Sequence, residues 1–197
     1  MIKPRNLAML MQRQADLVST SVYAAARPTC YVSYHDADFS EVEGFIRQFG
    51  TEFVPRCIGV TEQDRFVGSL DDHYIMSCVR EECLGDSTVT IVLVGKETWH
   101  QRFVDWEIAA SLISSPTRTR NGILALPLPS MRNRVILPER IRDNLAAGDD
   151  APSCATFESY PTSRDAFVAQ LGRAVAARSD ASSEVHNSRP LRRTDSP

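Results

Sequence analysis

The fold of this chain is decided by one stretch, Asp86-Ser-Thr-Val-Thr-Ile-Val-Leu-Val-Gly-Lys-Glu-Thr-Trp-His-Gln-Arg-Phe-Val-Asp-Trp-Glu-Ile-Ala-Ala-Ser-Leu112. Residues 89–94 are apolar or β-branched almost without a break, which is typical of a strand covered on both faces in a parallel sheet. Gly95 ends this strand, Thr98 is placed to cap a helix, and the helix itself is expected at residues 99–113.

One carboxylate on this helix needs an explanation. At about 100° per residue, a single arc of the helix holds Phe103, Val104, Glu107, Ala110 and Ser111. Glu107 therefore lies among apolar neighbours, where burying an unpaired polar group costs about 2–7 kcal/mol and a charge costs more. Either Arg102 or a loop cation pairs with Glu107, or Glu107 has a function.

Composition places the chain among ordinary globular proteins. It has 197 residues, 43% hydrophobic and 24% charged, which favours one domain. The net charge of −3 gives no basic surface for nucleic acid, and no apolar run reaches the length of a membrane span. Its five cysteines are scattered, without the paired spacing of a zinc site, so reduced thiols in the cytoplasm and no metal are expected.

The rest of the chain alternates expected strands with expected helices. Strands are expected at residues 30–34, 53–60, 122–128 and 155–160. Helices are expected at residues 40–49 and 162–178, and a further helix opens within residues 68–72 and extends to residue 83. Residues 1–27 are an expected N-terminal extension to a domain at 28–178. Residues 179–197 are rich in Ser, Asp, Arg and Pro and are expected to be a disordered tail.

This alternation predicts an α/β fold with a mainly parallel five-stranded sheet of flavodoxin-like order 2-1-3-4-5. Such sheets bind ligands beyond the carboxyl ends of the strands, where the strand order switches between strands 1 and 3. His35 and Asp36 follow the first strand, and residues 96–99 and the Glu107 helix follow the third. Two polar clusters far apart in the sequence are therefore expected at one crevice.

Several functions of this fold class are excluded by missing residues. A phosphorylated receiver domain needs an aspartate at the end of the third strand, where this chain has Val94-Gly95-Lys96. The sequence has neither the glycine-rich loop of a P-loop nucleotide-binding protein nor that of a Rossmann protein. A serine-nucleophile elbow is absent as well.

Four motifs in order resemble the bacterial TIR-like domain family, and in particular the TIR protein of Thoeris antiphage defence. They are Tyr-Val-Ser-Tyr-His-Asp (31–36), Asp72-x-Tyr-Ile with Arg80-Glu-Glu, Ser87-Thr-Val-Thr-Ile-Val-Leu-Val-Gly with Glu97-Thr-Trp, and Val104-Asp-Trp-Glu-Ile. The resemblance spans about residues 30–128. It implies the flavodoxin-like TIR fold and an active site that consumes NAD.

The resemblance assigns catalysis to Glu107, which matches the family's glutamate on the helix after the third strand. The implied reaction cleaves the bond between nicotinamide and ribose, and often cyclises the ADP-ribose into a signal. NAD is then the substrate, and no cofactor is expected. Candidates for binding NAD are Ser33, His35, Asp36, Trp99 and Phe103. Trp99 and Trp106 could stack on a ring of NAD, with packing or surface roles as the alternatives for all of these residues.

The resemblance also implies partners. TIR enzymes commonly assemble to become active, so a homo-oligomer on activation and a downstream effector that senses the nucleotide product are expected. Many TIR domains are instead scaffolds without activity. The alternative function is thus a signalling adaptor that acts through homotypic contacts, in which Glu107 is a structural residue.

Overall fold

The computed structural model describes residues 27–56, 69–132, 134–146, 153–180, 182 and 184–195. Its strands are β1 (Thr29–Ser33), β2 (Val54–Arg56), β3 (Val89–Val94), β4 (Gly122–Pro127) and β5 (Ala155–Phe157). All four strand pairings are parallel, and the strand order is β2-β1-β3-β4-β5. This is the predicted flavodoxin-like order, and it places β1 beside β3 at the switch point.

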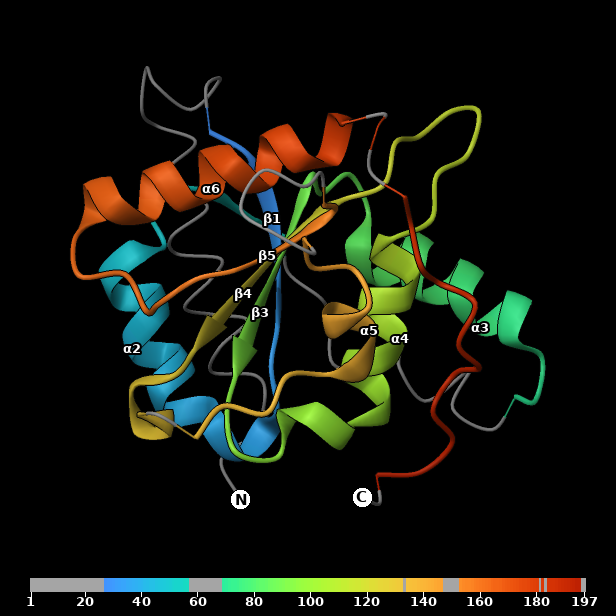
Figure 1. Ribbon diagram of the computed structural model, residues 1–197, viewed down its shortest axis with the longest axis horizontal. Coiled ribbons are helices and arrows are strands. Elements are labelled where there is room, and N and C mark those ends of the chain that lie inside the picture. The colour runs from blue at the N-terminus through green and yellow to red at the C-terminus, as the bar shows by residue number, and fades with distance from the viewer. Residues whose placement is uncertain are drawn as a thin grey trace.

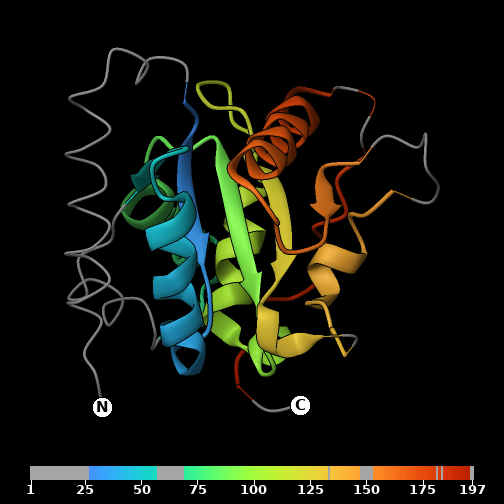
Figure 2. The ribbon, with the colours of Figure 1, turned by 90° about the vertical axis from the view of Figure 1, so that its left-hand side faces the viewer.

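Helices cover both faces of the sheet. They are α2 (Phe39–Phe49), α3 (Asp72–Cys78), which continues as a π-helical turn (Val79–Leu84), α4 (Arg102–Ser111), α5 (Glu139–Arg142) and α6 (Arg164–Ser179). Figure 1 shows α2 and α6 on one side of the sheet and α3, α4 and α5 on the other. Figure 2 views the molecule from the α2 and α6 side.

Side-chain alternation divides the core between these two layers. Cys30 and Val32 of β1 pack in the cluster under α2 and α6, whereas Tyr31 packs in the cluster under α3 and α4. Every residue of β3 is buried, as its continuous apolar sequence predicts for the central strand. Because alternate residues of a strand point to opposite faces, Tyr31 and Ser33 both face the α4 layer.

Several boundaries differ from the predictions. The strand expected at residues 53–60 is β2, a short edge strand that contains Pro55, and residues 57–60 lie outside the described range. The expected helix at 99–113 is divided into a 3₁₀ turn (Thr98–His100) and α4. Thr98 does not cap α4, because its hydroxyl accepts the Gly95 N–H at 2.8 Å.

The expected N-terminal extension lies outside the described residues apart from Arg27. The C-terminal tail differs from the expected disorder, because residues 184–195, here called the strap, lie along α3, α4 and α5 (Figure 1). Leu191 of the strap is only 6% exposed. The polar composition suggested disorder, but the arginines of the strap meet acidic side chains of the domain.

Among the described residues, no helix combines the length and the apolar character that crossing a membrane requires.

Candidate active site

The site is built around the carboxylate of Glu107, where β1 meets α4. The Tyr31 hydroxyl donates to Glu107 Oε1 at 2.5 Å, and the Ser33 hydroxyl donates to Oε2 at 2.6 Å. Both donors come from the β1 residues that face α4, so strand alternation places them together. The two hydrogen bonds fix the carboxylate at the β1 side of the helix.

The environment of Glu107 changes its protonation. Glu107 is only 7% exposed to solvent. Burial raises the pKa of Glu107 to about 7, although the hydrogen bonds from Ser33 and Tyr31 lower it, and the charge of Asp36 raises it further. The carboxyl group therefore titrates near neutral pH, which is typical of functional carboxylates more often than of surface ones.

No cation neutralises Glu107 within the described part of the chain. The Arg102 guanidinium lies over the Phe103 ring, 5.0 Å from its centroid, and forms an ion pair with Asp195 at 3.8 Å. The ion pair between Arg102 and Glu107 that the sequence left open is therefore not formed. Asp105, on the other side of α4, pairs with Arg140 at 2.9 Å.

The loop after β1 brings further acidic groups to the site. Asp36 is exposed but lies near enough to raise the pKa of Glu107. Asp38 packs against the backbone of Gly95 at the end of β3, where a β-carbon would collide with its carboxylate. Burial raises the pKa of Asp38, while the neighbouring His35 lowers it. Acidic side chains therefore gather where the loop after β1 meets the end of β3 and the Glu107 carboxylate.

The other predicted residues have separate environments. His35 caps the 3₁₀ turn at Asp36–Asp38, where its Nδ1 accepts the Ala37 N–H at 3.1 Å. Phe103 is half-buried and packs on Trp106, with their ring centroids 5.4 Å apart. Phe103 also joins the apolar cluster that contains Tyr31, so it lies in the layer behind the site.

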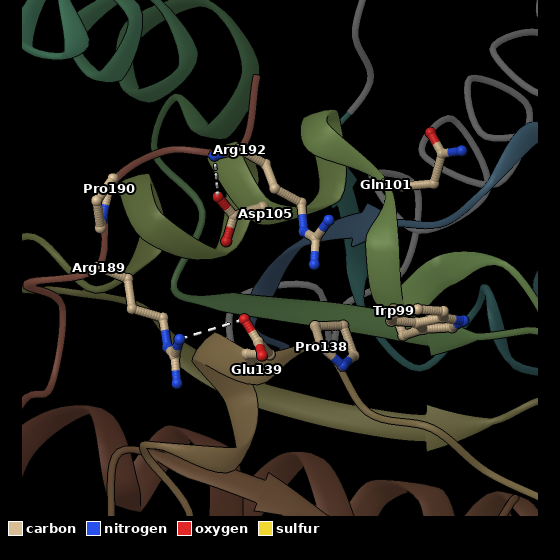
Figure 3. Close-up of a pocket in the computed structure, with 8 residues that line it drawn as sticks. All are labelled: Trp99, Gln101, Asp105, Pro138, Glu139, Arg189, Pro190 and Arg192. Carbon is tan, nitrogen blue, oxygen red and sulfur yellow. Dashed lines mark hydrogen bonds and ion pairs between the residues drawn. The ribbon is translucent and has the colours of Figure 1, made fainter. Parts of the chain in front are cut away.

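Trp99 is directed to a different cavity. That cavity has a volume of about 200 Å³ and is lined by Trp99, Gln101, Asp105, Pro138, Glu139, Arg189, Pro190 and Arg192 (Figure 3). It lies between the strap, α5 and the start of α4, and Glu107 is not among its lining residues. The structure therefore brings Ser33, Asp36 and Glu107 together and places Trp99 elsewhere.

Tyr31 is the site residue that sequence reasoning missed. Tyr31 lies two residues before Ser33 on the same strand. Alternation alone would have placed it on the face of Ser33 and Glu107. Burial, with the charge of Glu107 as a further cause, raises the pKa of the Tyr31 hydroxyl well above its usual value, so it stays a hydrogen-bond donor.

The sheet order, the helices on both faces and the strand-3 helix define an α/β protein of the TIR-like class. The chain belongs to the family of the TIR-like domain of Thoeris protein ThsB, whose family model matches residues 31–133. The matched region runs from β1 through β4 and includes Glu107 and both of its hydroxyl donors. No match is found among curated proteins or among solved structures.

Proposed function

We propose that this protein cleaves the bond between nicotinamide and ribose in NAD, with Glu107 as the catalytic residue. The observation that carries the proposal is a buried carboxylate held by two hydroxyl donors, with no ion pair to a cation in the described residues. Membership of the Thoeris ThsB family supports a role in antiphage defence, in which the product, an ADP-ribose cyclised on itself, signals to an effector.

The chemistry needs few groups. Nicotinamide leaves as a neutral molecule from a cationic ring, taking the electron pair of the bond to ribose, so a strong general acid is not required. The remaining ribose carbon is oxocarbenium-like, as in glycoside cleavage. An ionised Glu107 stabilises this positive charge and accepts hydrogen bonds from the ribose hydroxyls. A hydroxyl of the same ADP-ribose, or water, then forms the new bond to that carbon and gives its proton to the Glu107 carboxylate.

The charges near Glu107 support a cationic leaving ring. Asp36 lies near the carboxylate, and the same short loop carries a second acidic residue, Asp38, and one basic residue, His35. Negative charge favours binding of the cationic pyridinium ring of NAD. It does not favour binding of the neutral nicotinamide that leaves. Tyr31 and Ser33 hold the carboxylate in one orientation, so less reorganisation is needed in the transition state.

One observation favours the adaptor as the second candidate. Both oxygens of Glu107 are already hydrogen-bonded, and the residue is only 7% exposed. A structural carboxylate that joins α4 to β1 would have the same contacts. A catalytic carboxylate must in addition be reached by the substrate, and each of its oxygens can still accept a second hydrogen bond from a ribose hydroxyl.

The experiment is a measurement of nicotinamide released from NAD by the purified full-length chain, at high protein concentration and with or without phage-infected lysate. Glu107→Gln preserves the shape of the side chain and loses its charge, and the exposed Glu81 provides a matched control, Glu81→Gln. We expect release by the wild type and by Glu81→Gln, and none above background by Glu107→Gln. No release by a folded wild type under either condition would favour the adaptor.

A further inference from the structure

The strap runs antiparallel to α4 along the whole length of the helix. Asn187 Nδ2 donates to Ala109 O at 3.0 Å, near the end of α4. The Trp106 indole N–H donates to Arg192 O at 2.8 Å, one turn earlier. Asp195 Oδ1 accepts the Arg102 N–H at 2.8 Å, in the first turn. The helix that carries Glu107 is therefore held from outside by a segment about ninety residues later.

Asp195 supplies the N-terminal cap that α4 lacks locally. The residue before the helix, Gln101, makes no capping hydrogen bond with its side chain. A carboxylate at a helix N-terminus satisfies a free N–H group and interacts favourably with the helix dipole. Asp195 provides both at the start of α4, and its carboxylate also pairs with the Arg102 side chain.

The surface under the strap, here called the groove, is opposite to the strap in charge. Arg189 pairs with Glu139 and Asp143 of the α5 region, and Arg193 pairs with Asp72 at the start of α3. Between them, Leu191 is 6% exposed and packs in the cluster that contains Trp106. A short basic segment with a central apolar side chain therefore fits this acidic groove.

Arg140 connects the groove to α4 and to the strap. It is 1% exposed and pairs with Asp105, two residues before Glu107. Its remaining donors reach the Asn187 side chain at 2.8 Å and two strap carbonyls, those of Arg189 and Pro190, at 3.2 Å each. The strap thus supplies most of the acceptors of this guanidinium, and water would have to replace them when the strap leaves. The cavity of Figure 3 lies directly beside these contacts.

We propose that the strap is a detachable latch: it docks in this groove as a peptide does, and its docking keeps α4, and with it Glu107, in place. The strap forms no helix or strand of its own. The side chains of the Arg189–Glu139 and Arg193–Asp72 ion pairs are 40–44% exposed, so salt weakens these pairs. Segments held in this way open locally without global unfolding. The consequence for catalysis rests on the proposed function, whereas docking does not.

Amide hydrogen exchange tests the latch in the full-length chain. Leu191→Asp removes the apolar anchor, and Ser188→Asp adds the same charge at an exposed strap position as a control. We expect exchange in the first turn of α4 to accelerate about tenfold or more in Leu191→Asp alone, with β3 unchanged. Adding a synthetic peptide of residues 187–195 should slow it again.

Three results would overturn the latch. They are unchanged exchange in α4, equal acceleration in α4 and β3, and no response to the peptide. If Leu191→Asp does not fold, Asp195→Asn decides, since Asp195 is exposed and its loss should accelerate only the first turn of α4. Should the exchange results hold while the wild type releases no nicotinamide, the latch stands and the proposed function fails.

Discussion

Two effects shift the pKa of the Glu107 carboxyl group in opposite directions. Removal from water favours its neutral form, and the hydroxyls of Ser33 and Tyr31 favour its ionised form. Burial is the larger effect, so the pKa lies at about 7 and both forms are present at neutral pH. Catalysis by the ionised form should therefore increase as pH rises through about 7.

Tyr31→Phe should move that titration upward. The change removes the donor at 2.5 Å from Oε1 and leaves burial unchanged, so the pKa of Glu107 rises by on the order of one unit. The pH at which nicotinamide release is half-maximal should rise by the same amount. Tyr160→Phe, on the opposite layer of the core, is the control and should leave the pH profile unchanged. An unshifted profile in Tyr31→Phe would show that its hydrogen bond does not tune Glu107.

At the scale of elements, β3 depends on being apolar along its entire length. Val92 is 0% exposed in the middle of this strand, so Val92→Asp places a charge where it has no water and no partner. We expect a loss of several kcal/mol and no cooperative folding at room temperature. Leu70→Asp, at a position 87% exposed, should melt like the wild type. Circular dichroism during heating compares the three proteins, and a cooperative melt of Val92→Asp would contradict the account of β3.

The sequence predicted the elements whose patterns are local. The expected bounds of β3, α2 and α6 lie within a few residues of the observed ones. Contacts distant in the sequence were not predictable in this way. The hydrogen bond from Tyr31 to Glu107 spans 76 residues, and the cap on α4 comes from Asp195. The strap in particular has the composition of a disordered tail, and only the acidic groove explains why it docks.

For the whole molecule, Glu107 makes stability depend on pH. Its carboxyl group keeps a proton in the folded chain up to a pKa of about 7, whereas in the unfolded chain it ionises near the ordinary value of 4.5. Between about pH 4.5 and pH 7 the folded state binds more protons than the unfolded state. The contribution of Glu107 to stability is therefore largest below this pH range and decreases as pH rises through it. At about 1.4 kcal/mol per pKa unit, the loss is roughly 3 kcal/mol.

Glu107→Gln should remove that loss. Urea unfolding of the wild type and the variant at pH 5 and pH 8 measures it directly. We expect the fall in unfolding free energy between the two pH values to be smaller in Glu107→Gln, by up to roughly 3 kcal/mol. Equal falls in both proteins would show that Glu107 has the same proton affinity in the folded and unfolded chains.

Assembly is the second prediction for the whole molecule. If copies of the chain must associate before they act, as the proposed function expects, nicotinamide release per mole of protein should rise with protein concentration and then level off. Sedimentation at the same concentrations should show the oligomer forming over the same range. A specific rate that is constant across a hundredfold dilution would mean that the isolated chain is sufficient.

The most direct test of the central claim is the pH profile of nicotinamide release from NAD by wild type and Glu107→Gln, measured side by side under activating conditions. The account predicts a wild-type rate that rises through pH 7, as the carboxyl group with a pKa of about 7 ionises, and no release by Glu107→Gln at any pH. Release by Glu107→Gln at the wild-type rate would contradict the assignment of catalysis to this carboxylate.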